Sequence, residues 1–286
     1  MANFDPKQFV ETQRRDWNRV SSAWEKWDAW LDVSMGSCNR RLVERARLVS
    51  GQRVLDLGCG TGYPAIPAAL RVGNTGHVTG VDLAEEMIEV ARRKAAALGL
   101  KHVEFRACDV ASLPFEDAGF DSVISRFCLM FLPHLDKALH ETRRVLKPGG
   151  TVAAAVWAVR EKNPFLSIPM GVLKDFIEMP PMDPSIPGIF YLGQPGDLMA
   201  RMKTAGFTNL VEEEVPVEGI YTSGREYLEC LQEIAAPLQA LFAKVPPDKR
   251  RAVGDGIIAA AEKFRRDGKV RIPGVALAVS GIKPRA

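Results

Sequence analysis

The sequence predicts an α/β fold, a doubly wound seven-stranded mostly parallel sheet with helical cap insertions. Two observations predict it. Short apolar strands alternate with amphipathic helical segments over residues 51–158, a rhythm typical of a parallel sheet covered by helices on both faces. The first strand also runs into a glycine-rich turn, Val54-Leu55-Asp56-Leu57-Gly58-Cys59-Gly60-Thr61-Gly62. Glycines there let the chain turn tightly and let a ligand lie on the main chain.

The remaining elements follow in order along the chain. Further strands are expected at 77–82, 103–110, 120–126, 151–157, 208–217 and 275–282, and helices at 6–49, 63–72, 84–98, 134–146, 195–205, 224–243 and 248–267. The helix over 84–98 shows the reasoning. It has Glu85 and Glu86 in its first turn, which suits the positive end of the helix dipole, and Gly99 ends it.

The glycine turn differs from a dinucleotide-binding loop. Such a loop has the pattern G-x-G-x-x-G and places a pyrophosphate at a helix N-terminus. Here Tyr63 stands where the third glycine of that pattern would be, and Asp56 is a poor neighbour for a pyrophosphate. A carboxylate suits a positively charged ligand such as S-adenosylmethionine, which carries an ammonium and a sulfonium and no phosphate.

Residues 54–62 resemble the first motif of class I S-adenosylmethionine-dependent methyltransferases. The resemblance continues in order over about residues 50–158, through His77-Val78-Thr79-Gly80-Val81-Asp82, Val103-Glu104-Phe105-Arg106-Ala107-Cys108-Asp109-Val110, Phe120-Asp121-Ser122-Val123-Ile124-Ser125-Arg126 and Arg144-Val145-Leu146-Lys147-Pro148-Gly149-Gly150. The group that it resembles most is the ubiquinone/menaquinone C-methyltransferase-like small-molecule enzymes. The resemblance implies a Rossmann-like methyltransferase fold with S-adenosyl-L-methionine as cofactor.

The resemblance also implies roles for individual residues. Asp56 would face the methionine end of the cofactor, Asp82 would accept hydrogen bonds from the ribose hydroxyls, and Asp109 would meet the adenine amino group. The full set of expected cofactor-binding residues is Asp56, Gly58, Cys59, Gly60, Thr61, Gly62, Asp82, Leu83, Met87, Asp109, Val110, Arg126, Trp24 and Trp27. Arg126 has two alternatives, pairing with an anionic substrate or pairing with Asp109 or a helix terminus.

The tryptophans at the start of the chain form a helical series. Trp17, Trp24, Trp27 and Trp30 are spaced seven, three and three residues apart, which places most of them on one face. This face either packs on the core or covers the mouth of the cofactor and substrate site. In the second case, Trp24 and Trp27 are the residues expected to cover the mouth.

Catalytic residues are harder to predict than cofactor residues. Methyl transfer from a sulfonium is an in-line displacement that depends on alignment and exclusion of water, and one general base helps where the acceptor must lose a proton. The candidates are His134, Tyr191 and Tyr221. The alternative for His134 is a surface position at a helix N-terminus without a catalytic role. The alternative for each tyrosine is a role in packing.

These patterns predict an ordered division of the chain. It consists of an N-terminal helical lid (1–50), a cofactor-binding core (51–158), a cap insertion (159–193), a core continuation (194–222), a helical cap (223–269) and a final core strand (270–286). Prolines at 164, 169, 180, 181, 184 and 187 lie among apolar and Met residues in the cap insertion. Because prolines break helices, this insertion is expected to be irregular and adaptable to apolar ligands; the alternative is a plain loop that covers the core.

Composition narrows the class of protein. Hydrophobic residues make up 47% of the 286-residue chain, enough for a full core, and a net charge of +3 does not point to nucleic acid. Five scattered cysteines without a C-x-x-C pattern fit reduced thiols in a cytoplasmic protein. Neither a secretory leader nor a membrane span is expected, and no metal is implied. The oligomeric state stays open.

The sequence therefore predicts methyl transfer to a small, fairly apolar metabolite, such as a quinone precursor, a polyketide, a terpenoid or another specialised metabolite. Two alternatives remain: a methyltransferase that acts on RNA or protein, and a non-catalytic protein that binds the cofactor. An arsenite methyltransferase would need grouped cysteines, which the spacing does not support.

Overall fold

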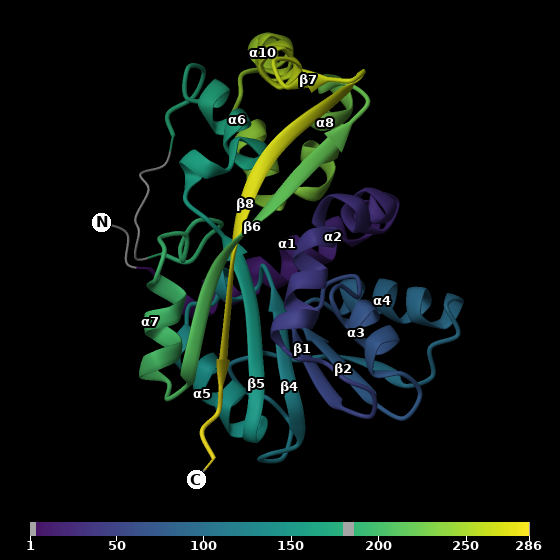
Figure 1. The fold of residues 1–286 in the computed structure, drawn as a ribbon. Coiled ribbons are helices and arrows are strands. Elements are labelled where there is room, and N and C mark those ends of the chain that lie inside the picture. Colours follow the sequence, from purple (N-terminus) through teal and green to yellow (C-terminus); the bar gives the residue numbers. More distant parts are fainter. Residues whose placement is uncertain (1–3, 180–185, 286) are drawn as a thin grey trace.

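The computed structural model describes residues 4–179 and 186–285 as a mixed α/β fold (Figure 1). The sheet has the order β3-β2-β1-β4-β5-β8-β6. Its strands are β1 (Arg53–Leu57), β2 (His77–Asp82), β3 (Val103–Ala107), β4 (Phe120–Arg126), β5 (Leu146–Trp157), β6 (Thr208–Tyr221) and β8 (Lys269–Ile282). Strands β1 to β5 pair in parallel, and β8 runs antiparallel to both β5 and β6. The predicted sheet is confirmed, and a short β7 (Arg265–Arg266) pairs with β8 beside it.

The chain order of the strands creates a crevice at one edge of the sheet. From β1 the chain winds outward to β2 and β3, and from β4 it winds in the other direction to β5. The connections that leave the carboxyl ends of β1 and β4 therefore diverge, which is where open α/β sheets bind ligands. The central strands are almost wholly buried, as expected for parallel strands covered on both faces.

Helices cover the two faces of this sheet. The helices of the core are α3 (Ala65–Val72), α4 (Glu85–Ala97), α5 (Leu135–Val145) and α7 (Asp197–Thr204), with the short 3₁₀ turn η1 (Leu129–Phe131) after β4. In Figure 1, α3 and α4 lie on one side of the sheet and α5 and α7 on the other.

The N-terminal segment consists of two helices where the sequence predicts one. Helix α1 (Pro6–Lys26) is capped at its N-terminus by Asp5, whose side chain accepts hydrogen bonds from the amides of Lys7 and Gln8. At Trp27 the backbone leaves helical geometry, and α2 (Asp28–Arg45) follows. Helix α1 contacts α4 of the core and two helices of the cap, α8 (Gly224–Ile234) and α9 (Ala236–Ala243). Helix α2 lies against β4, β5, β6 and α3.

The cap is built on a long ribbon. Strands β6 and β8 pair from Thr208↔Ile282 to Tyr221↔Val270, so both extend beyond the predicted 208–217 and 275–282 and rise out of the core (Figure 1). Gly219, Pro273 and Gly274 lie in the added stretches, and they concealed these parts of the strands because Pro and Gly are rare inside sheets.

The ribbon carries the helices of the cap. These are α8 (Gly224–Ile234), α9 (Ala236–Ala243), η3 (Pro247–Lys249) and α10 (Arg250–Glu262), joined by η2 (Arg160–Lys162) and α6 (Pro164–Leu173) from the segment after β5. The predicted helix 224–243 is thus interrupted at Ala235, two residues before Pro237. The predicted helix 248–267 is shorter because Arg265 and Arg266 form β7.

Two smaller corrections concern the expected elements. The third strand ends at Ala107 rather than Val110, because the Asp109 side chain accepts a hydrogen bond from the amide of Ala111 in a local turn. In the cap insertion, Pro180, Pro181, Met182 and Pro184 lie outside the described residues. Within residues 4–179 and 186–285, no helix combines the length and apolarity needed to cross a bilayer.

Candidate active site

The glycine turn after β1 shapes the base of the site. Gly58, Gly60 and Gly62 all have a positive φ. A Cβ on Gly58 would lie 2.4 Å from the Cβ of Cys128, so only glycine fits between β1 and β4 here. At Gly60, by contrast, no atom within 4 Å would meet an added Cβ. The space above Gly60 is therefore available for a ligand that lies on the main chain.

Three acidic side chains stand near the carboxyl ends of neighbouring strands: Asp56 in β1, Asp82 in β2 and Asp109 after β3. Asp82 ends β2, and its two carboxylate oxygens accept hydrogen bonds from the amides of Gly60 and Ala84, both at 2.9 Å. Asp82 thereby fixes the glycine turn while each oxygen keeps a lone pair for a ligand. Asp109 lies beyond β3 and is exposed, with one oxygen held by the local turn.

A buried polar cluster lies next to the glycine turn and contains Asp56, Arg126 and Asn39. The Arg126 guanidinium donates a 2.8 Å hydrogen bond from Nη1 to Oδ1 of Asn39 on α2, and the rings of Tyr63 and Phe127 lie 5.6 and 5.9 Å from it. Asp56 is fully buried. Burial raises the pKa of Asp56 to about 8, against the opposing effect of the Arg126 charge.

Several polar atoms of this cluster lack partners. Within the described residues, both carboxylate oxygens of Asp56, Nε of Arg126 and Nδ2 of Asn39 make no hydrogen bond. Buried polar groups are ordinarily paired, and each exception needs an explanation. Two unpaired donors beside an unpaired carboxyl group suit the carboxylate and ammonium of an amino acid. The cluster therefore fits the methionine end of S-adenosylmethionine.

A cavity of about 230 Å³ opens above this edge of the sheet and continues toward the cap. Its lower part contains the glycine turn, Asp82, Asp109 and Arg126. Its upper part is lined by aromatic side chains from α1, α2, β5, α6 and the segment after β4: Trp17, Trp24, Trp30, Phe127, Phe131, Trp157 and Phe165. The rings of Phe127 and Trp157 are stacked, with centroids 4.0 Å apart and an angle of 6° between them.

The structure brings most of the predicted cofactor residues to this cavity. Those that line it are Gly58, Cys59, Gly60, Thr61, Asp82, Leu83, Met87, Asp109, Val110, Arg126 and Trp24. Asp56 and Gly62 lie behind the glycine turn and are buried. Trp27 is not among the lining residues; its indole Nε1 donates to Glu233 of α8 at 2.7 Å.

The three predicted catalytic residues lie in different surroundings. His134 lines the cavity at its exposed margin, directly before α5. Tyr191 is partly buried, packs against the core and is not among the residues that line the cavity. Tyr221 is fully buried behind Trp30, with ring centroids 5.3 Å apart, so its hydroxyl does not reach the cavity. Of the three, only His134 borders the space in which an acceptor would lie.

Sequence reasoning missed Asn39, Trp30 and the aromatic wall beyond β4 and β5. Asn39 carries no motif, because its role depends on the packing of α2 against the end of β4. Phe127 adopts a left-handed conformation, with φ of 57°, which nothing in the sequence indicates. Within the described residues, no group of three or more His, Cys, Asp or Glu side chains is placed to hold a metal ion.

Comparison with known proteins agrees with this geometry. Residues 48–175 match the family described as a methyltransferase domain. The chain is 37% identical over 136 residues to aklanonic acid methyltransferase DauC from Streptomyces sp. strain C5, covering 48% of this chain and 60% of that protein. It is 42% identical over 149 residues to demethylmenaquinone methyltransferase from Staphylococcus aureus, covering 52% and 61%.

Among solved structures, a putative methyltransferase from Bacillus halodurans has a TM-score of 0.56 at 23% identity, with 87% of this chain and all of that chain covered. The chain spans about three fifths of the length of DauC and of the S. aureus protein. We conclude that residues 48–175 form a methyltransferase domain, and the fold and the two curated relatives support the class I, S-adenosylmethionine-dependent type.

Proposed function

We propose that this protein transfers a methyl group from S-adenosylmethionine to a small, fairly apolar acceptor. The observation that carries the proposal is the continuity of one cavity from the glycine turn and Asp82 to the aromatic chamber under the cap. Such a chamber can bury an apolar acceptor next to the cofactor and exclude water, which is the main requirement of an in-line displacement.

The residues at the sheet edge would hold the cofactor in one orientation. Asp82 would accept hydrogen bonds from the ribose hydroxyls, and Asp109 would accept one from the adenine amino group. Leu83, Met87 and Val110 would pack around the adenosine. Arg126, which lines the cavity, would pair with the carboxylate of the methionine end, Asn39 would hold Arg126 in place, and the buried charge of Asp56 would favour the ammonium from beneath.

When bound, S-adenosylmethionine supplies an electrophilic methyl group. The aromatic side chains under the cap would hold the nucleophilic atom of the acceptor in line with that methyl group, and the acceptor would lose a proton on transfer. His134 is the predicted base that borders the cavity. Because it stands at the exposed margin, it can pass that proton to water.

Two features favour a small-molecule acceptor over RNA or protein. Arg126 is the only Lys or Arg among the described lining residues, whereas nucleic-acid binding depends on several cations that neutralise phosphates. The names of these two curated relatives also point to small molecules, aklanonic acid for one and demethylmenaquinone for the other.

A labelling experiment tests the proposal. Purified protein is incubated with methyl-labelled S-adenosylmethionine and a host-cell extract, and the products are divided into organic-soluble and acid-precipitable fractions. Label in the organic fraction supports the proposal, and mass spectrometry then identifies the acceptor. Label in the precipitate would instead indicate RNA or protein. Tight cofactor binding without any turnover would favour a non-catalytic role.

A further inference from the structure

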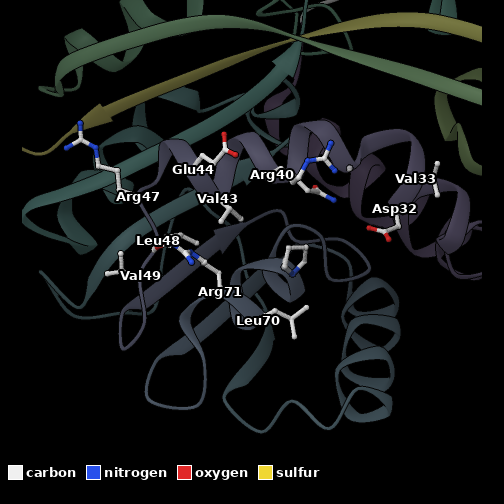
Figure 2. Close-up of a pocket in the computed structure, with 13 residues that line it drawn as sticks. Asp32, Val33, Arg40, Val43, Glu44, Arg47, Leu48, Val49, Leu70 and Arg71 are labelled. Atoms are coloured by element: carbon white, nitrogen blue, oxygen red, sulfur yellow. Dashed lines mark hydrogen bonds between the residues drawn. The ribbon is translucent and has the colours of Figure 1, made fainter.

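A second hollow lies outside the active site, between α2 and α3. This groove has a volume of about 1030 Å³ and is lined by 13 residues (Figure 2). Three of the seven exposed large hydrophobic side chains of the described residues line it: Val33, Val49 and Leu70, which are 68%, 52% and 66% exposed. Apolar side chains gathered on one surface often mark an interface. This groove is therefore a candidate binding surface.

The outer face of α2 has the pattern of a helix that packs against another helix. Val33, Gly36, Arg40 and Val43 follow one another at spacings of three, four and three residues and all line the groove, the spacing of a coiled-coil seam. Gly36 is notable because glycine inside a helix costs about 0.5–1 kcal/mol relative to alanine. Within this chain, an added Cβ there would meet only Arg40, at 3.5 Å. The close approach of a second helix would explain this glycine.

Charged side chains line the groove along its length. Asp32 lies at one end and Arg47 at the other, with Arg40 and Glu44 between them, and Arg71 of α3 faces them (Figure 2). From Asp32 to the end of α2 at Arg45 the helix rises by about 20 Å at 1.5 Å per residue, and Arg47 lies two residues beyond that end. Neither Asp32 nor Arg47 makes an ion pair within the described residues. A second α2 that runs in the opposite direction would place its Arg47 against Asp32 at one end and its Asp32 against Arg47 at the other.

We propose that the occupant is a second copy of this chain, and that α2 of each copy packs antiparallel against α2 of the other in a two-fold symmetric dimer. In this arrangement the two-fold axis crosses α2 near Arg40, and Asp32 of each copy faces Arg47 of the other. Leu70 and Val49 flank the helix pair on both sides. Such self-complementarity is what a two-fold interface requires.

The size of the groove sets the expected strength of the dimer. Its 13 lining residues are fewer than the roughly 20–30 residues per partner of a standard stable interface. The dimer is therefore expected to be concentration-dependent, with a dissociation constant on the order of micromolar.

Sedimentation equilibrium over about 1 to 100 μM protein measures this equilibrium directly, and it does not depend on any activity. Leu70→Glu should raise the dimer dissociation constant at least tenfold. The matched control is Leu98→Glu, since Leu98 is similarly exposed, at 58%, but lies at the end of α4 outside the groove. Circular dichroism establishes that both variants are folded.

A charge exchange tests the antiparallel arrangement. Asp32→Lys places two cations at each end of its own dimer, and Arg47→Asp places two carboxylates there. Each variant alone should be monomeric. An equimolar mixture should dimerise, because the Lys and Asp that were introduced pair at one end while the native Arg47 and Asp32 pair at the other. Recovery in the mixture supports the proposal. A monomeric wild type at every concentration, or a dimer that neither variant weakens, would overturn it.

Discussion

The buried Asp56 carboxyl should make the stability of the cofactor-free protein depend on pH. Its pKa is 3.8 in an unperturbed aspartate and is raised to about 8 in the folded protein. Between these values the folded chain keeps a proton that the unfolded chain has released. The unfolded state therefore binds fewer protons, and the free energy of unfolding falls as pH rises through this range.

The size of this effect follows from the shift. Each pH unit between the two pKa values lowers the free energy of unfolding by about 1.4 kcal/mol. Keeping Asp56 protonated in the folded protein therefore destabilises the fold by on the order of 2 kcal/mol at pH 5 and 6 kcal/mol at pH 8. Asp56→Asn has nearly the same shape and no ionisation. Its buried amide lacks partners, which costs about 1–3 kcal/mol. The substitution should thus be close to neutral at pH 5 and stabilising by a few kcal/mol at pH 8.

Urea unfolding of the cofactor-free wild type and the Asp56→Asn variant at several pH values measures the difference. Asp109→Asn is the control, because Asp109 is exposed and keeps the oxygen that its turn uses. If the free energies of unfolding of wild type and Asp56→Asn changed with pH in the same way, the reasoning would be refuted. Calorimetry on the same variant should show weaker cofactor binding, since a neutral amide cannot pair with an ammonium.

Three further predictions concern the site. Asp82→Ala should weaken cofactor binding by about 2 kcal/mol, or roughly 30-fold, because charge-assisted hydrogen bonds are lost; an unchanged dissociation constant in calorimetry would contradict this role. Gly58→Ala should lower the free energy of unfolding by at least about 2 kcal/mol, since its Cβ would overlap Cys128, and a wild-type urea midpoint would argue against the crowding. Tyr221→Phe keeps the stacking on Trp30 and should leave kcat/KM within about twofold; a large loss in the labelling assay would restore the predicted catalytic role of Tyr221.

The cofactor edge of the site was predictable from sequence because it depends on local rules. Where a parallel strand ends, its next side chain lies at the carboxyl edge of the sheet, and the methyltransferase resemblance assigned Asp82 and Asp109 to that edge. The glycine turn was equally local. Each of its glycines needs a positive φ, and the spacing alone indicated this.

The aromatic wall was less predictable because it depends on how distant segments meet. A continuous helix over 6–49 would put Trp24 and Trp27 on one face. The break at Trp27 turns α2 relative to α1, so that Trp27 contacts Glu233 of the cap and Trp30 enters the cavity instead. The burial of Tyr221 behind Trp30 was not predictable either, because it depends on the ribbon of β6 and β8, whose length the sequence did not indicate.

Helix α2 relates the two cavities of the molecule because it borders both. Its inner face supplies Leu31 and Met35 to the active-site cavity, and its outer face supplies Val33 and Val43 to the groove. Asn39 lines the groove and also accepts the 2.8 Å hydrogen bond from Arg126. A rigid helix transmits a small displacement along its whole length, so a partner that shifts α2 also shifts the residue that orients Arg126. Occupancy of the groove should therefore change the affinity for the methionine end of the cofactor more than the affinity for adenosine alone.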